Sequence, residues 1–288
     1  MATQTFDAVK YKAAQRQDWS TASAGWKKWW MIIEQGFTPV TQRMVELAQV
    51  RTGQRVLDVA TGIGEPALTA ARLVGPSGHV TATDIAPGML EIATERAKQA
   101  GLSNIEFREM DAESIDFPEG SFDAVLCRFG LMFLPNLAAS LKAIRRVLAT
   151  GGHLAAAVWG PPERHFGTVT MGAVARELQL APPPPGTPNI FSLADRTALE
   201  RSLAQAGLTD VRTEPLNVTA EFDSVDAYIR MLQDTSPPIW NLLANQSEER
   251  KAKVWRAVAE ANRPFAAADG TLHLEAESVL VAARKPGA

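Results

Sequence analysis

One stretch decides the fold: Val56-Leu57-Asp58-Val59-Ala60-Thr61-Gly62-Ile63-Gly64. It is typical of a short apolar strand that ends in a turn with two glycines, and a helical pattern begins directly after it, near Glu65. Strand and helix patterns continue to alternate as far as residue 160, which predicts a parallel sheet with helices on both faces. The predicted strands are nearly continuous in apolar residues, as expected of strands that are covered on both sides.

Composition limits the possible partners and surroundings of the chain. With 288 residues, 46% hydrophobic and 21% charged, it can bury a core, and we expect one core with an appended cap. Lys and Arg number 29 against 32 Asp and Glu, without a long basic run, so we expect no nucleic-acid partner. The single Cys127 suits a reducing cytoplasm, and no apolar run is long enough for a signal peptide or a membrane span, so we expect a cytoplasmic protein.

The pattern along the chain predicts four parts. Residues 1–50 form a helical lid, 51–160 the ligand-binding core, 161–193 a cap insertion, and 194–288 the end of the sheet with a helical insertion at about 222–270. The first part carries four tryptophans, including Trp26 and Trp30. These rings either pack the helix onto the core or close over a ligand, and the sequence leaves both interpretations open.

Two classes of ligand are compatible with the glycine turn. Gly62-x-Gly64-x-x-Ala67 also matches the dinucleotide fingerprint of nicotinamide-dependent oxidoreductases. Asp58 separates the two classes, because a carboxylate inside this strand repels phosphates and suits a ligand with an ammonium or sulfonium group. The alternative role of Asp58 is that of a hydrogen-bonded structural carboxylate.

Acidic residues also follow the next two predicted strands. Asp84 lies 20 residues beyond Gly64, where an acidic side chain can accept both hydroxyls of a ribose. Asp111 could accept a hydrogen bond from an adenine amino group, with Ile85 and Met89 on either side of the ring. Since the carboxyl ends of parallel strands share one edge of the sheet, these positions predict a nucleoside site there.

In this order, the stretches resemble those of the class I S-adenosylmethionine-dependent methyltransferases over about residues 50–160. Within that class the sequence is most similar to the quinone-biosynthesis C-methyltransferase group and its small-molecule relatives. The stretches that carry this second resemblance are Phe117-Pro118-x-x-Ser121-Phe122-Asp123, Phe129-Gly130-Leu131, Arg145-Arg146-Val147-Leu148 and Gly151-Gly152.

The resemblance implies a Rossmann-like sheet of seven strands in the order 3-2-1-4-5-7-6, with the last strand antiparallel. It also implies S-adenosyl-L-methionine as cofactor, S-adenosyl-L-homocysteine as product, and a set of cofactor-binding residues. Asp58 would lie near the methionine moiety, Asp84 on the ribose, Asp111 and Ala112 at the adenine, Arg128 and Phe129 along the inner side of the cofactor, and Gly62 and Gly64 beneath it, with Ala60 and Ile63 beside them.

The chain departs from this family pattern at two places that bear on function. Ala60 stands where the first glycine of the motif is common, which is compatible if Ala60 keeps an extended backbone. Met132 and Phe133 stand where the quinone methyltransferases tend to be more polar, which argues against a quinone acceptor.

The acceptor site is expected to be apolar and aromatic. Its candidate residues follow strands or lie in the lid and cap: Trp26, Trp30, Met132, Phe133, Trp159 and Tyr228. His165 is the candidate general base, because it follows the fifth predicted strand at the same edge as the cofactor site. We expect no metal, since no His/Cys cluster is present.

The sequence therefore predicts methyl transfer to an oxygen or carbon of an apolar or aromatic small molecule. The alternatives are an N-methyltransferase of a small amine, an NAD-dependent oxidoreductase and a non-catalytic cofactor-binding protein. A homodimer is compatible with this prediction.

Overall fold

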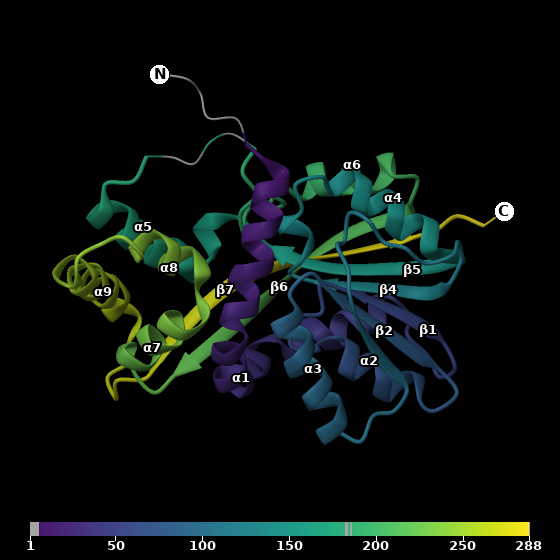
Figure 1. The fold of residues 1–288 in the computed structure, drawn as a ribbon, viewed down its shortest axis with the longest axis horizontal. Helices are drawn as coiled ribbons and strands as arrows, with labels where there is room; N and C mark the ends of the chain where they lie inside the picture. Colours follow the sequence, from purple (N-terminus) through teal and green to yellow (C-terminus); the bar gives the residue numbers. More distant parts are fainter. Residues whose placement is uncertain (1–5, 182–183, 185, 288) are drawn as a thin grey trace.

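The computed structural model describes residues 6–181, 184 and 186–287, and its centre is one seven-stranded sheet in the order β3-β2-β1-β4-β5-β7-β6 (Figure 1). The strands are β1 (Arg55–Val59), β2 (His79–Asp84), β3 (Ile105–Glu109), β4 (Phe122–Arg128), β5 (Leu148–Trp159), β6 (Thr209–Phe222) and β7 (Leu272–Arg284). Strands β1 to β5 pair in parallel, whereas β7 runs antiparallel to both β5 and β6. The predicted fold class and strand order are confirmed.

The helices lie on both sides of this sheet. They are α1 (Ala8–Leu47), α2 (Ala67–Val74), α3 (Pro87–Gln99), α4 (Leu137–Val147), α5 (Phe166–Leu178), α6 (Arg196–Gln205), α7 (Val225–Thr235), α8 (Pro237–Leu243) and α9 (Glu248–Asn262), with short 3-10 turns at Leu131–Phe133, Pro162–Arg164 and Arg263–Phe265. Figure 1 shows α4 and α6 above the strands and α2 and α3 below them. Strand β1 is therefore enclosed, and its residues Val56 and Leu57 are fully buried.

The position of β1 determines where a ligand can bind. It pairs with β2 on one side and with β4 on the other. The loop after β1 leads to α2 on one face of the sheet, and the loop after β4 leads to α4 on the other face. These two loops therefore diverge and leave a crevice at the carboxyl edge of the sheet.

Two long strands extend beyond this edge. Strand β7 pairs with β5 only from Ser278 to Arg284, whereas its pairing with β6 continues to Leu272. Helices α5, α7, α8 and α9 lie beside the protruding part of this hairpin and pack on one another through apolar side chains. We call these four helices the helical unit (Figure 1). Residues 182, 183 and 185 of the expected 161–193 insertion lie outside the described residues.

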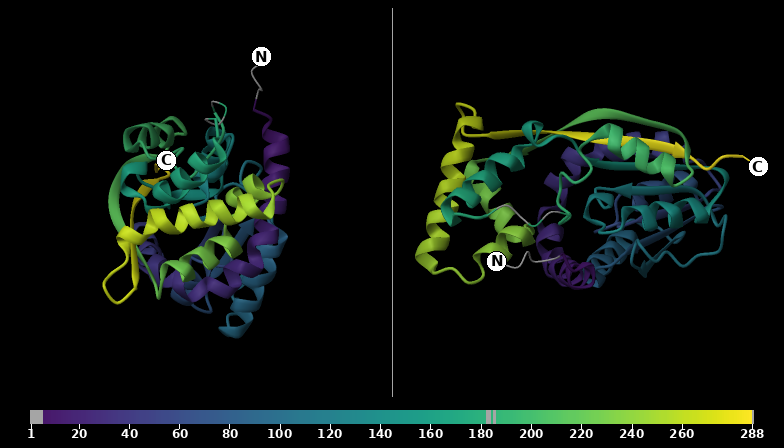
Figure 2. Two further views of the ribbon diagram at one scale, coloured as in Figure 1. Left: turned by 90° about the vertical axis from the view of Figure 1, so that its left-hand side faces the viewer. Right: turned by 90° about the horizontal axis from the view of Figure 1, so that it is seen from above.

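Helix α1 connects the helical unit to the sheet. It begins after Asp7, whose side chain accepts hydrogen bonds from the backbone N–H groups of Val9 and Lys10, and it continues for 40 residues. It contacts α3, β6 and α7, and it runs between the sheet and the helical unit (Figure 2). Within the described residues, no helix combines the length and apolar character needed to cross a bilayer.

Candidate active site

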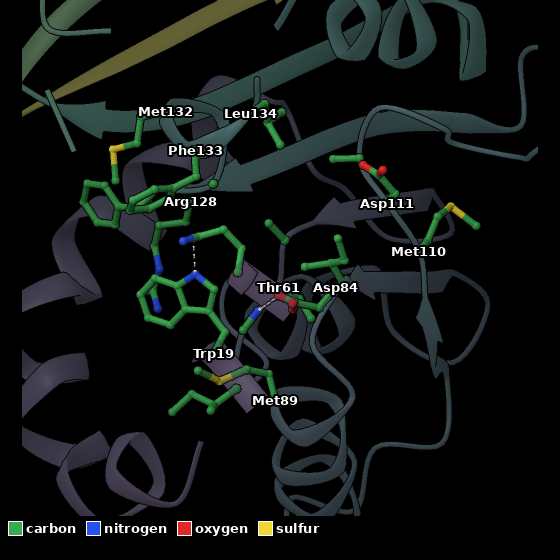
Figure 3. A pocket seen from close by; sticks show the side chains of 18 of the residues that line it. Trp19, Thr61, Asp84, Met89, Met110, Asp111, Arg128, Met132, Phe133 and Leu134 are labelled. Atoms are coloured by element: carbon green, nitrogen blue, oxygen red, sulfur yellow. Dashed lines mark hydrogen bonds between the residues drawn. The ribbon is translucent and has the colours of Figure 1, made fainter. Parts of the chain in front are cut away.

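A cavity of about 340 Å³ opens at the carboxyl ends of β1, β2 and β4. Figure 3 shows Asp84, Met110 and Asp111 on one side of it, and Trp19, Arg128, Met132 and Phe133 on the other. All of the predicted cofactor-binding residues line this cavity except Asp58 and Gly64. The lining residues are Lys12, Gln15, Trp19, Trp26, Phe37, Ala60, Thr61, Gly62, Ile63, Glu65, Asp84, Ile85, Met89, Met110, Asp111, Ala112, Arg128, Phe129, Gly130, Met132, Phe133, Leu134, Pro135, Trp159 and Ile190.

The turn after β1 forms the floor of the cavity. Gly62 has a φ of 56°, and a Cβ atom built on it would meet nothing within 4 Å. Its backbone N–H donates a hydrogen bond of 2.8 Å to Asp84 Oδ2 (Figure 3). Gly64 has a φ of 108° and faces the protein instead, with Leu68 Cδ1 at 3.1 Å from its ideal Cβ position. The first glycine therefore leaves room for a ligand, and the second allows the turn to pack on α2.

Ala60 does not keep the extended backbone that we expected. Its φ is 56°, and Phe129 at the end of β4 has a φ of 60°. The left-handed region costs a residue with a Cβ atom roughly 1–2 kcal/mol. Both residues line the cavity, so the strained backbone lies at the ends of the two strands that form it.

Two buried carboxylates support this floor. Asp84 accepts hydrogen bonds from Gly62 N–H and, at 2.9 Å, from Ala86 N–H. Burial raises the pKa of Asp84, although these N–H donors oppose the shift. Asp58 is fully buried beneath the turn and accepts from Ala67 N–H at 3.1 Å. Burial raises its pKa to about 7.

Two oxygen atoms next to this turn have no hydrogen-bond partner in the described part of the chain. They are Oδ1 of Asp58 and Oγ1 of Thr61, and both are buried. An unpaired buried polar atom is costly in a completed site. Thr61 lines the cavity, so its hydroxyl is placed to pair with a polar ligand group, whereas Asp58 lies beneath the turn and does not line the cavity.

Helix α1 supplies a cation beside the predicted adenine position. Lys12 Nζ lies 2.6 Å from Asp111 Oδ2 and 3.0 Å from Glu113 Oε2. The hydrogen bond with Asp111 is the first cause of a raised Lys12 pKa. Asp111 also accepts from the backbone N–H of Glu113 through Oδ1. The N-terminal part of α1 is thereby tied to the loop after β3.

Arg128, at the end of β4, is held by α1 in a buried ion pair. Its Nη2 lies 2.6 Å from Glu34 Oε1, and its Nη1 lies 2.9 Å from Glu34 Oε2 and 2.8 Å from Thr41 Oγ1. Burial lowers the pKa of Arg128, but Glu34 outweighs burial and the pKa is raised overall. The Arg128 guanidinium also lies over the ring of Phe37, 5.3 Å from its centroid.

An aromatic wall continues from Arg128 away from the acidic end. Phe129 stacks on Trp159 with ring centroids 4.2 Å apart, and Phe37 packs against both rings. On the opposite side, Trp19 meets Phe133 edge to face at 5.9 Å. The cavity therefore has a polar end at Asp84 and Asp111 and an aromatic end at these rings.

Comparison with known proteins agrees with this geometry. Residues 56–152 match the family described as "Methyltransferase domain". The aklanonic acid methyltransferase DauC of Streptomyces sp. strain C5 is 42% identical over 119 residues, which cover 41% of this chain and 54% of DauC. The ubiquinone/menaquinone biosynthesis C-methyltransferase UbiE of Pseudomonas putida F1 is 43% identical over 111 residues, which cover 38% of this chain and 43% of UbiE. The chain thus spans about half the length of the curated relatives it matches.

Residues 56–152 are thus similar to methyltransferase domains.

Solved structures extend the likeness of the fold beyond residues 56–152. The YcgJ protein of Bacillus subtilis aligns with a TM-score of 0.56 at 21% identity, over 86% of this chain and 98% of YcgJ. The [4+2]-cyclase SpnF aligns with a TM-score of 0.53 at 21% identity, over 87% of this chain and 82% of SpnF. Since one of these proteins is a cyclase, the shared fold alone does not specify the reaction.

Several residues predicted for the methyltransferase site lie away from the cavity. Trp30 is 39% exposed, and its ring packs against the Arg96 guanidinium on α3. Tyr228 is fully buried inside the helical unit, where its hydroxyl lies 2.9 Å from Thr170 Oγ1. Neither side chain is therefore placed to contact an acceptor in this cavity.

His165 also does not line the cavity. It precedes α5, and its Nδ1 accepts a hydrogen bond of 2.9 Å from Gly167 N–H. It packs against Trp159, which separates it from the cavity. Burial lowers the pKa of His165 to about 4, so it is neutral at neutral pH.

The sequence predicts a helical lid over residues 1–50 with Trp26 at the site, but it does not identify the other residues of α1 that line the cavity. Lys12, Gln15 and Trp19 lie on the same face of this helix as Trp26, at spacings of three, four and seven residues, and Phe37 lies further along it. This spacing could have identified a common face, but nothing in it indicates which part of the sheet that face covers. Glu34 was missed for the same reason.

Proposed function

We infer that this protein is an S-adenosylmethionine-dependent methyltransferase that acts on an oxygen or carbon of an apolar or aromatic small molecule. The inference rests on one observation above all: a single cavity joins a polar end suited to a nucleoside with an aromatic end suited to an acceptor. The methyltransferase domain match over residues 56–152 supports the first half of this statement. DauC and UbiE, which are named for small-molecule methylation, support the second half.

The residues at the polar end fit the cofactor. Asp84 would bind the ribose hydroxyls, and Asp111 would face the adenine amino group, with Ile85 and Met89 beside the ring. The space above Gly62 and the unpaired hydroxyl of Thr61 would receive the methionine moiety, with Asp58 buried beneath it. When bound, S-adenosylmethionine supplies an activated methyl group, which passes to the acceptor by in-line displacement.

The aromatic end would orient the acceptor and exclude water. Trp26, Met132, Phe133 and Trp159 line the cavity, and we propose that they contact the substrate. A flat apolar molecule held against the stacked Phe129 and Trp159 rings would present one atom toward the polar end. Such alignment can supply much of the rate of a displacement reaction without a protein base. We therefore assign His165 a structural role as the N-terminal cap of α5.

The first half of α1 would act as the lid of this site. Lys12 reaches the predicted adenine residue Asp111, and Trp19 and Trp26 cover the cavity. The second half of α1 carries Glu34, whose removal would leave Arg128 buried without a counter-ion. Deletion of residues 1–14 thus tests the lid, and deletion of residues 1–35 would also disturb the core. We expect the short deletion to leave the protein folded and to lower turnover.

Calorimetric titration with S-adenosylhomocysteine tests the function, with NADH as the control ligand. We expect micromolar binding of the first and no binding of the second. Transfer of a labelled methyl group to a panel of phenols, quinols and polycyclic aromatic acids then tests the acceptor class. Absence of S-adenosylhomocysteine binding would overturn the function, and transfer to small amines alone would overturn the acceptor class.

A further inference from the structure

Arg128 has more hydrogen-bond donors than its protein partners use. A guanidinium carries five N–H groups in one plane. Glu34 accepts from Nη1 and Nη2, and Thr41 accepts a second hydrogen bond from Nη1. Nε and the remaining hydrogen of Nη2 have no partner among the described residues. These two N–H groups are parallel and point in the same direction, because they form one edge of the planar group.

This free edge is accessible from the cavity. Although the Arg128 side chain is only 7% exposed, it lines the cavity. Its unpaired Nε is not fully enclosed by protein atoms. In Figure 3, Arg128 lies with Met132 and Phe133, across the cavity from Asp111. The free donors thus lie beside the aromatic end and away from the predicted adenine position.

The position of Arg128 is constrained by α1. Glu34 and Thr41 hold its other edge, and the Phe37 ring lies beneath its plane. A long side chain that is already immobilised loses little rotamer freedom when it binds a ligand. The two free donors are therefore a preorganised pair with the spacing that a carboxylate accepts.

The charges around this edge permit an anion. Glu34 compensates the Arg128 charge, and Glu65 and Asp58 add negative charge nearby. Burial and the charge of Glu34 raise the pKa of Glu65, and burial raises the pKa of Asp58, so both carboxyl groups hold a proton more readily than exposed carboxyl groups do. The half-buried Arg96 lies in the same cluster as a second cation.

We propose that the free edge of Arg128 binds a carboxylate of the acceptor, and hence that the acceptor is an aromatic carboxylic acid whose ring lies against Phe129 and Trp159. This proposal rests on the proposed function. It adds a specificity-determining residue to it, since a neutral aromatic molecule of equal size would leave two buried N–H donors unpaired.

The same edge could instead hold the carboxylate of the cofactor's own methionine moiety. The two sources make different predictions. If the edge binds the cofactor carboxylate, Arg128→Lys lowers the affinity for S-adenosylhomocysteine. It then leaves the affinity for 5′-methylthioadenosine, which lacks that carboxylate, unchanged. If the edge binds the acceptor carboxylate, Arg128→Lys changes the affinity for either nucleoside by no more than about threefold.

Two probes of the same shape test the acceptor site by calorimetry on the full chain loaded with S-adenosylhomocysteine. They are 2-naphthoate, which carries a carboxylate, and 2-naphthamide, its neutral counterpart. We expect the wild type to bind 2-naphthoate about tenfold or more tightly than 2-naphthamide, as two charge-assisted hydrogen bonds would give. Arg128→Lys keeps a charge to pair with Glu34 but loses the planar pair of donors, and should reduce this preference below about threefold.

Arg43→Lys is the matched control. Arg43 also lies in an ion pair between α1 and another element, here with Glu214 on β6, and it does not line the cavity. It should keep the wild-type preference. Equal affinity of the wild type for both probes, or a preference that survives Arg128→Lys, would overturn the proposal. Failure to bind S-adenosylhomocysteine would instead count against the proposed function.

Discussion

The polar end of the cavity and its aromatic end come from different parts of the chain. The polar end is built from the turns after β1, β2 and β3, which all lie between residues 58 and 112. The aromatic end joins Phe37 on α1 to Phe129 after β4, Trp159 at the end of β5 and Ile190. The first is specified by short local motifs, whereas the second depends on how distant elements pack. The contrast explains how one cofactor site can serve many acceptors.

The largest expected effect is at the Arg128–Glu34 ion pair, which joins β4 to α1 beside the aromatic end. Glu34→Ala leaves the Arg128 guanidinium buried without its counter-ion, and we expect it to lower the free energy of unfolding by about 3–5 kcal/mol. Urea denaturation measures this change. Arg16→Ala, which removes an ion pair whose side chains are each 47% exposed, should cost less than about 1 kcal/mol.

A second variant separates charge burial from lost packing. If the cost of Glu34→Ala comes from the uncompensated charge, the double variant Glu34→Ala with Arg128→Met should recover part of the stability. If the stability losses of Glu34→Ala and Arg128→Met add up in the double variant instead, α1 and β4 are joined by packing alone.

At the polar end, the buried carboxyl of Asp58 should make stability depend on pH. Its pKa is raised from 3.8 to about 7 in the folded protein, so the folded state holds a proton there that the unfolded state has released. The free energy of unfolding should therefore fall as pH rises from about 4 to 7, by roughly 4 kcal/mol for this group, and then level off.

Asp58→Asn removes this titration and provides the comparison. Denaturation curves at pH 5 and pH 8 should differ less for Asp58→Asn than for the wild type. An equal difference for both proteins would mean that other groups carry the pH dependence.

A smaller effect is expected on the cofactor. Asp84→Ala removes the carboxylate predicted to bind the ribose and should weaken S-adenosylhomocysteine by about 1–3 kcal/mol in calorimetry. The binding of 5′-methylthioadenosine should weaken by the same factor, because it has the same ribose. Asp123→Ala is a control, since Asp123 accepts from Arg55 N–H at the start of β1, at the opposite edge of the sheet. Unchanged affinity in Asp84→Ala would contradict the ribose assignment.

These regions also differ in how far the sequence predicts them. The alternation of strands and helices and the cavity-lining places of Gly62, Asp84 and Asp111 follow from patterns that each lie within a few residues, and the resemblance to a known family adds the strand order. Glu34, Phe37 and Lys12 could not be assigned, because their role depends on where a 40-residue helix crosses the sheet. Trp30 and Tyr228 were placed at the acceptor site by residue type, and packing directs them to Arg96 and Thr170 instead.

Ala60 shows the limit of a local argument even within the well-predicted region. An extended backbone was expected there, but its φ is 56°, and Ala60 lies where the ends of β1 and β4 meet so closely that a Cβ on Gly130 would lie 2.6 Å from Ala60 Cβ. The neighbouring strand therefore contributes to the conformation of a residue that the motif alone does not determine.

The smallest expected effect tests this strain directly. Ala60→Gly removes the Cβ atom that is unfavourable at positive φ and should raise the free energy of unfolding by about 1 kcal/mol. Ala252→Gly, at an exposed position inside α9, should lower it by about 0.5–1 kcal/mol, because there glycine only adds backbone freedom. Opposite signs in urea denaturation would establish that the floor of the cavity stores strain. A loss of stability in both variants would mean that the Ala60 methyl group contributes more by packing against the end of β4 than it costs in backbone energy.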